Sequence, residues 1–293
     1  MYYRRKIILA IIQKFGGKVM NTDLQKYLFL FVKSQDKPAY DFVPYKFGCF
    51  SFQSYADKRT LTKYGILADQ DDWKKDDDVD YFSMLNPDDR RSLRKLIVNY
   101  GNLKGNELIN RVYCDYPYFA INSEIINSIL TADQIAKVED EKPKDAKPGI
   151  FSIGYESKSF DHYLNQLVQN NIQILIDVRK NALSMKYGFS KNQLKNALEK
   201  LRIDYLHLPE LGIVSKKRTD LNSLDDYNRL FKEYESTVLQ NETDGLQRIV
   251  NELATRKRIA ITCFEFDHKY CHRSRVINKI QHISSSKIEV SYI

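Results

Sequence analysis

The segment CFEFDHKYCHR, residues 263–273, brings two cysteines, two histidines, a glutamate and an arginine into one short stretch. It follows directly on the apolar run IAIT, so it begins where a buried strand is expected to end. Side chains of these types serve three kinds of site: a metal centre, a redox pair of thiols, or a polar pocket that grips an anion.

Spacing favours the anion pocket. Cys271, His272 and Arg273 open a predicted helix, whose free N–H groups and positive end attract anions, and Arg273 adds a planar cation. Zinc is disfavoured because no Cys-x2-Cys or His-x3-His pair is present, and a redox pair is disfavoured because Cys-x-x-Cys is missing. Cys263 itself is expected to be a buried packing residue of the core. We therefore predict no metal and no cofactor.

Other polar side chains follow the neighbouring predicted strands, and the carboxyl ends of parallel strands meet at one edge of a sheet. The residues expected to bind a ligand there are Tyr155, Arg179, His207, Glu210, Cys271, His272 and Arg273. Glu265 and Asp177 are the candidates for general acid or base. The structural alternatives are ion pairs from Asp177 to Arg179 and from Glu265 to Arg273, and a hydrogen-bonding role for His207.

Strand and helix patterns alternate over residues 150–293. Apolar strands are predicted at 149–156, 172–178, 203–208, 258–264 and 287–293, with helical segments between them. Strands of near-continuous apolar character joined by helices form parallel sheets that are covered on both faces. The pattern therefore predicts an α/β domain with a Rossmann-like, mainly parallel sheet.

Residues 1–137 show a different order of elements. Helical patterns at 4–15, 24–34 and 51–67 are followed by a short hairpin around 66–82. This order is typical of a winged helix-turn-helix, so we predict a mostly helical, winged-helix-like N-terminal domain. The charged segment 138–149, which contains two prolines, is predicted to be the linker.

Two resemblances accompany these patterns. IGYE, LIDVRKNALSMKYGFSK, YLHLPELG and TCFEFDHKYCHRSRV occur in this order and resemble the domain-of-unknown-function 488 family across nearly all of 150–293. Members often have Asp-Pro where Asp267 is followed here by His268. LQKYLFLF, YDFVPYKFGCFS and LTKYGIL resemble the Panacea or SocA-like antitoxin domain, although FGCF replaces the proline-containing turn. The first resemblance implies a fold more than a reaction, and the second implies a regulatory role.

The whole chain has a net charge of +8 and a pI near 9.0, which favours polyanionic partners. The basic residues Lys216, Lys217 and Arg218 lie in a loop that either contacts phosphate or is solvated. No apolar run is long enough to span a bilayer, and the four cysteines do not form a disulfide scaffold, so we expect a cytoplasmic protein without membrane contact.

These observations lead to one expectation of function and two alternatives. We expect a protein that binds nucleic acid or a nucleotide and that processes a phosphate-containing ligand at the carboxyl edge of the α/β sheet. The alternatives are a non-catalytic nucleotide sensor, and an antitoxin-like or phage-defence regulator that acts through a protein partner.

Overall fold

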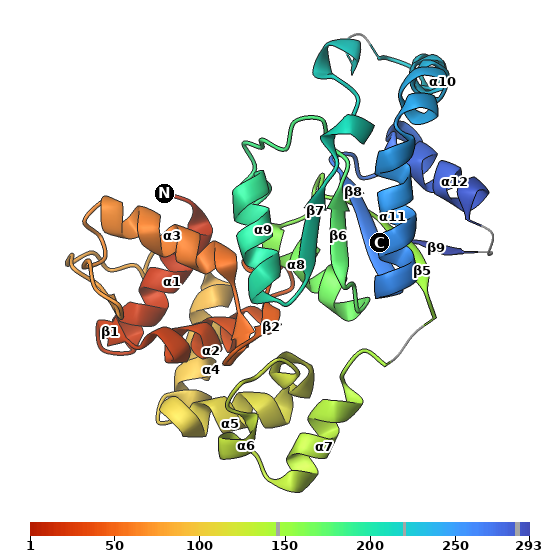
Figure 1. Cartoon of the computed structure of the whole chain (residues 1–293). Coiled ribbons are helices and arrows are strands. Elements are labelled where there is room, and N and C mark those ends of the chain that lie inside the picture. The colour runs from red at the N-terminus through yellow and green to blue at the C-terminus, as the bar shows by residue number, and fades with distance from the viewer. Residues whose placement is uncertain (145–146, 219–220, 285–287) are drawn as a thin grey trace. The chain divides into compact units, whose positions relative to one another are not determined.

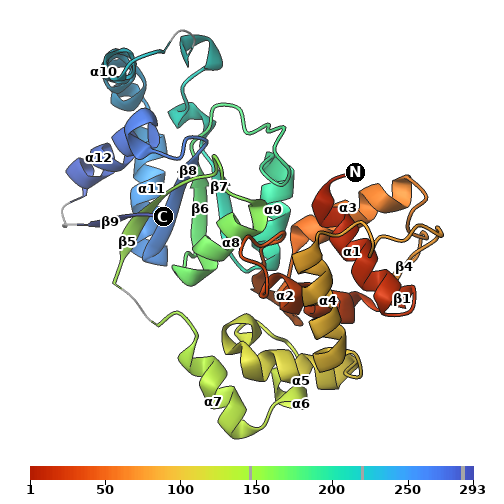
Figure 2. The same cartoon turned by 180° about the vertical axis from the view of Figure 1, so that it is seen from behind.

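The computed structural model describes residues 1–144, 147–218, 221–284 and 288–293. The chain divides into two compact units, Met1–Lys142 and Pro143–Ile293 (Figures 1 and 2). Of the predicted linker 138–149, the first three residues belong to the last helix of the N-terminal unit, and residues 145–146 lie outside the described part. Among the described residues, no helix is both long and apolar enough to cross a bilayer.

The N-terminal unit consists of helices around a core of aliphatic and aromatic side chains. Its elements are α1 (Tyr3–Lys14), β1 (Lys18–Val19), α2 (Asn21–Val32), β2 (Val43–Tyr45), β3 (Gly48–Phe50), α3 (Phe52–Lys63), β4 (Trp73–Lys74), α4 (Pro87–Tyr100), α5 (Gly105–Asp115), η1 (Pro117–Ala120), α6 (Ile126–Ile129) and α7 (Ala132–Asp140). Helix α2 is buried along most of its length, so it forms the centre of this core.

The predicted hairpin around 66–82 is present over 66–76. An antiparallel bridge joins Leu67 to Lys75, and the N–H groups of Ala68 and Asp76 donate to the carbonyls of Lys74 and Ile66. On its other side β4 pairs with β1, the two-residue strand between α1 and α2. Segment 69–80 also carries seven aspartates and two lysines, which disfavours contact with a phosphate backbone. The winged-helix-like architecture and nucleic-acid binding by this unit stay predictions.

The C-terminal unit contains a five-stranded sheet in the order β7-β6-β8-β5-β9, and all its described pairings are parallel (Figure 1). Its elements are β5 (Gly149–Gly154), α8 (Phe160–Gln169), β6 (Ile174–Asp177), α9 (Lys191–Lys200), β7 (Asp204–His207), η2 (Pro209–Leu211), η3 (Ser215–Arg218), α10 (Leu224–Asn241), α11 (Thr243–Arg256), β8 (Arg258–Cys263), η4 (His268–Tyr270), α12 (Arg273–Ile283) and β9 (Glu289–Tyr292). The predicted α/β class with a mainly parallel sheet is confirmed.

Helices cover both faces of this sheet. Ile261 packs in the cluster formed with α10, α11 and α12, whereas the neighbouring Thr262 accepts a hydrogen bond from Tyr163 of α8 on the opposite face. The connection from β5 runs past β8 to β6, and the connection from β8 runs past β5 to β9. Because the two connections leave in opposite directions, β5 and β8 flank the topological switch point, where such sheets bind ligands.

The two units should separate under limited proteolysis. Lys144 offers trypsin a cleavage position outside helices and strands, whereas Lys142 and Lys147 are each followed by a proline and resist cleavage. We expect brief digestion to leave two resistant pieces that meet at this region, because each unit has a core of its own. The pieces are identified by intact mass, and one resistant piece spanning 138–149 would contradict the predicted boundary.

Candidate functional site

Polar side chains meet at the carboxyl edge of the sheet as their strands end. The strand register sets Gly154 beside Cys263, and Asp177 beside both Thr262 and His207. The loops after β5 and β8 also approach closely, since a Cβ on Gly154 would lie 1.8 Å from the carbonyl oxygen of Glu265. Only glycine permits this approach.

Asp177 and Arg179 form a buried ion pair rather than two free groups. The Asp177 carboxylate accepts from Arg179 Nε at 2.9 Å and Nη2 at 2.6 Å, and from Tyr205 Oη at 2.7 Å. Arg179 Nη1 also donates to Tyr155 Oη and to the carbonyl of Phe189. These contacts favour the alternative in which Asp177 and Arg179 form a structural ion pair. The catalytic role predicted for Asp177 and the ligand-binding role predicted for Arg179 stay predictions.

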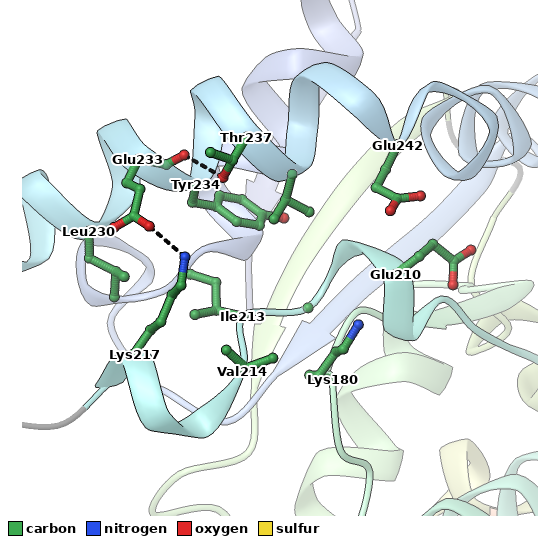
Figure 3. Close-up of a pocket in the computed structure, with 12 residues that line it drawn as sticks. Lys180, Glu210, Ile213, Val214, Lys217, Leu230, Glu233, Tyr234, Thr237 and Glu242 are labelled. Atoms are coloured by element: carbon green, nitrogen blue, oxygen red, sulfur yellow. Dashed lines mark hydrogen bonds and ion pairs between the residues drawn. The ribbon is translucent and has the colours of Figure 1, made fainter.

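His207 and Glu210 lie apart from the cysteine segment. His207 Nε2 donates to the carbonyl of Arg179 at 2.9 Å, in line with its structural alternative. Glu210 lines a cavity of about 270 Å³ between η2, η3 and α10, shown in Figure 3. The charged side chains that line this cavity are Lys180, Glu210, Lys217, Glu233 and Glu242. With three carboxylates against two ammonium groups, the cavity does not favour phosphate.

The cysteine segment folds into a compact cluster. The sulfur atoms of Cys263 and Cys271 and a ring nitrogen of His272 all lie within 4.8 Å of one another, and all three residues are buried. His272 Nε2 bonds to the carbonyl of Val178 at 3.0 Å, and the ring packs edge-on against Tyr234. These three side chains converge although no Cys-x2-Cys spacing is present, so the spacing alone does not exclude a metal.

Arg218 closes this cluster on one side. Its guanidinium donates to His272 Nδ1 at 2.8 Å and to Glu265 Oε1 at 2.7 Å. Glu265 therefore pairs with Arg218, and the predicted alternative of an ion pair with Arg273 is wrong. Glu265 Oε2 is buried without a hydrogen-bond partner among the residues that the structure describes.

Proximity of these groups shifts their proton affinities in opposite directions. The contacts with Cys271 and His272 hold the pKa of the Cys263 thiol well below its usual range, against the effect of burial. Burial and the neighbouring Cys263 raise the pKa of Cys271 well above its usual range. Burial, together with Cys263, also raises the pKa of Glu265. Cys263 is thus the thiol that ionises first.

Arg273 points away from the cluster and organises the preceding loop. Its Nε donates to Ser152 Oγ at 2.8 Å, Nη1 to the carbonyl of Glu265 and Nη2 to that of Phe266. All of these acceptors are neutral. The anion-binding role of Arg273 stays a prediction, and three of its five N–H groups already donate hydrogen bonds to protein oxygens.

Lys158 is the second cation in this region. It lies in the loop between β5 and α8 and is 8% exposed. Burial and the nearby charge of Arg273 lower the pKa of Lys158 to about 8. In the described parts of the chain, no carboxylate forms an ion pair with either Lys158 or Arg273. These two neighbouring buried cations thus have no counter-ion among the residues that the structure describes.

Sequence reasoning missed Lys158, Tyr205 and the particular role of Arg218. Lys158 had a weak signal, because it stands between a predicted strand and the N-terminus of a helix. Arg218 was noted only as part of a basic loop, and no pattern connects it to His272, which lies far along the chain.

Comparison with known proteins supports the family resemblance for part of the chain. Residues 159–280 match the family model described as domain of unknown function DUF488. The matched segment includes Asp177, Arg218 and the whole cysteine segment, whereas the N-terminal unit lies outside it. No curated protein and no solved structure gives a significant match.

Proposed function

We propose that the C-terminal unit binds a small phosphate-bearing ligand, a nucleotide in the first instance, at the carboxyl edge of the sheet between β5 and β8. The observation that carries this proposal is the burial of Lys158 beside Arg273, with no carboxylate partner for Lys158 in the described segments. Buried charges in proteins are paired or bind an ion, so an anionic ligand would supply the missing charge.

The position of Lys158 within the fold also supports this proposal. The loop that contains it joins β5 to the N-terminus of α8, where Ser159 caps the helix. Free N–H groups at a helix N-terminus attract phosphate, and β5 flanks the topological switch point of the sheet. The lysine and the N–H groups at the start of α8 therefore both attract an anion at this strand end, although the first turn of α8 also carries Asp161.

Replacing Lys158 with methionine should weaken nucleotide binding by about 10- to 100-fold, the value of one charge-assisted hydrogen bond. Affinity of the unaltered protein should fall as pH rises through about 8, because Lys158 then loses its proton. The methionine variant should lack this fall. Isothermal titration with adenine and guanine nucleotides and with inorganic phosphate measures both effects.

Lys279→Met is the matched control, because Lys279 is exposed on α12. In the absence of ligand, the Lys158→Met variant should be at least as stable as the unaltered protein. The change removes a buried charge that has no carboxylate partner among the described residues. The folded-state pKa is lowered, so unaltered protein should gain stability as pH rises above about 8. Equal affinities of the Lys158 and Lys279 variants would sink the proposal.

Enzymatic turnover and simple sensing make different demands on the same site. Glu265 follows β8, one of the two strands that flank the switch point. Its Oε2 has no partner among the described residues, so Glu265 is the candidate acid or base. In the alternative of a sensor, nucleotide binds and is recovered unchanged. Chromatography of nucleotide after incubation with stoichiometric protein separates these two alternatives.

A further inference from the structure

Three metal-binding side chains converge at the end of β8. Cys263 is the last residue of this strand, Cys271 follows η4, and His272 is the N-cap of α12. Their sulfur and nitrogen atoms lie within 4.8 Å of one another. The loop between them folds back because Arg273 holds the carbonyls of Glu265 and Phe266, and Asp267 caps η4.

The hydrogen bonds of His272 prepare one nitrogen to bind a metal. A carbonyl only accepts hydrogen bonds, so the contact with Val178 places the proton of the neutral ring on Nε2. Nδ1 then carries the lone pair, which accepts a hydrogen bond from Arg218 and faces Cys263. Histidine ligands of metals typically donate their other N–H to a backbone carbonyl in this way.

The separation of the donor atoms suits a tetrahedral ion of zinc size. Cys263 Sγ and His272 Nδ1 are 3.8 Å apart. Usual zinc–sulfur and zinc–nitrogen bond lengths at a tetrahedral angle require roughly 3.6 Å. Two sulfur donors and one imidazole are the ligands that select zinc over hard cations such as magnesium or calcium.

Arg218 and Glu265 occupy the open side of the cluster. Arg218 donates a hydrogen bond to the lone pair of His272 Nδ1, so a metal ion that binds this nitrogen must displace the guanidinium of Arg218. The side chain of Arg218 is 28% exposed, which leaves it room toward solvent. Glu265 Oε2 is buried and has no partner in the described chain, but no Glu265 oxygen belongs to the group of donor atoms within 4.8 Å of one another, so water is the expected fourth ligand.

We propose that Cys263, Cys271 and His272 bind one zinc ion, with the fourth position open to water. Binding releases the thiol protons, and the two thiolates then neutralise the charge of the ion. This site is separate from the anion site, because His272 and Arg273 point to different partners. Each proposal can therefore fail without the other.

The test is a zinc titration of reduced, chelator-treated full-length protein against a competing zinc indicator. We expect one zinc per chain. Cys263→Ser and Cys271→Ser should each weaken binding by more than about 100-fold, because losing a ligand costs more than the 10- to 100-fold of losing an outer partner. Cys49→Ser and Cys114→Ser are the matched controls in the N-terminal unit, and they should bind zinc like the unaltered protein.

Arg218→Gln gives an independent outcome. It removes the competitor for His272 Nδ1 and a repelling cation, so zinc affinity should stay equal or rise. If the cysteine variants fail to fold, cobalt binding to the unaltered protein tests the site instead. Thiolate ligation of cobalt produces charge-transfer bands in the near ultraviolet, so these bands are expected. Absence of these bands, absence of bound zinc, or full zinc affinity in either cysteine variant would overturn the site.

Discussion

Replacing Asp177 with alanine should lower the free energy of unfolding by about 3–5 kcal/mol, the usual cost of removing one partner of a buried ion pair. The change leaves the Arg179 guanidinium, which is 5% exposed, without its carboxylate, and it also removes the acceptor of Tyr205. For a unit of this size, such a loss corresponds to a drop in melting temperature of roughly 6–20 °C.

Circular dichroism during urea unfolding of the full-length protein measures this loss. The single tryptophan, Trp73, lies in the N-terminal unit, so its fluorescence transition should not move. Asp204→Ala is the matched control, since Asp204 forms an exposed pair with Arg256 and should change stability by less than about 1 kcal/mol. An Asp177 variant as stable as this control would show that the ion pair does not hold the sheet edge.

Removing both partners of the ion pair distinguishes two causes of destabilisation, the loss of the contact itself and the burial of an uncompensated Arg179 charge. The double change of Asp177 to alanine and Arg179 to methionine should recover part of the stability, because no uncompensated charge remains buried. Recovery would show that Asp177 acts by holding Arg179. A catalytic Asp177 would instead leave stability nearly unchanged and abolish turnover.

Asp57→Asn should destabilise the N-terminal unit by about 3 kcal/mol at neutral pH, at the lower end for a buried pair because Arg4 is partly exposed. The carboxylate of Asp57 accepts from Arg4 and Arg5 of α1, each at 2.6 Å, and from Tyr40 Oη at 2.9 Å. The Asp57 side chain of α3 thus binds both α1 and the segment before β2 through hydrogen bonds to one carboxylate.

The loss should depend on pH in a defined direction. Burial alone raises the pKa of Asp57, but the hydrogen bonds from Arg4 and Arg5 outweigh it, so the pKa lies below its ordinary value. A lowered folded-state pKa contributes stability above the unfolded pKa of about 4, and this contribution is lost as pH falls through the folded value. The difference between unaltered and variant protein should therefore shrink in acid.

Trp73 fluorescence during urea unfolding at several pH values measures this difference. Asp88→Asn is the control, because Asp88 pairs with Arg91 on the surface of α4 and should have little effect at any pH. A difference that stays constant from neutral to acid pH would contradict the role given to the Asp57 carboxylate.

Local pattern was enough to predict the architecture of the C-terminal unit. Strands such as Ile174–Asp177 are apolar throughout because helices cover both faces of a parallel sheet, and this leaves a signal in the sequence itself. Helix starts are local too, as at Ser159, whose side chain caps α8. In contrast, β1 and β4 have two residues each, and only packing in the folded unit selects their pairing.

The candidate site likewise combines features set by local sequence pattern with features set by tertiary packing. The sequence by itself placed Asp177, Cys263 and Glu265 at one edge of a parallel sheet, because strand ends and strand direction follow from residue pattern. Side-chain partners across many residues do not follow from it. Only the tertiary structure turned Arg218 toward His272, and it separated Arg273 from the cysteines by turning it toward Ser152.

Metal-ligand spacing rules assume that the ligands lie on one short turn, where chain geometry alone holds them together. Cys263 and Cys271 do not meet this condition, and the folded loop between β8 and α12 brings them together instead. The burial of Lys158 is likewise decided by neighbours distant in sequence. Residue types and strand ends were thus determined locally, whereas contacts, burial and charge pairing arose from tertiary packing, because they depend on segments that meet only in the folded chain.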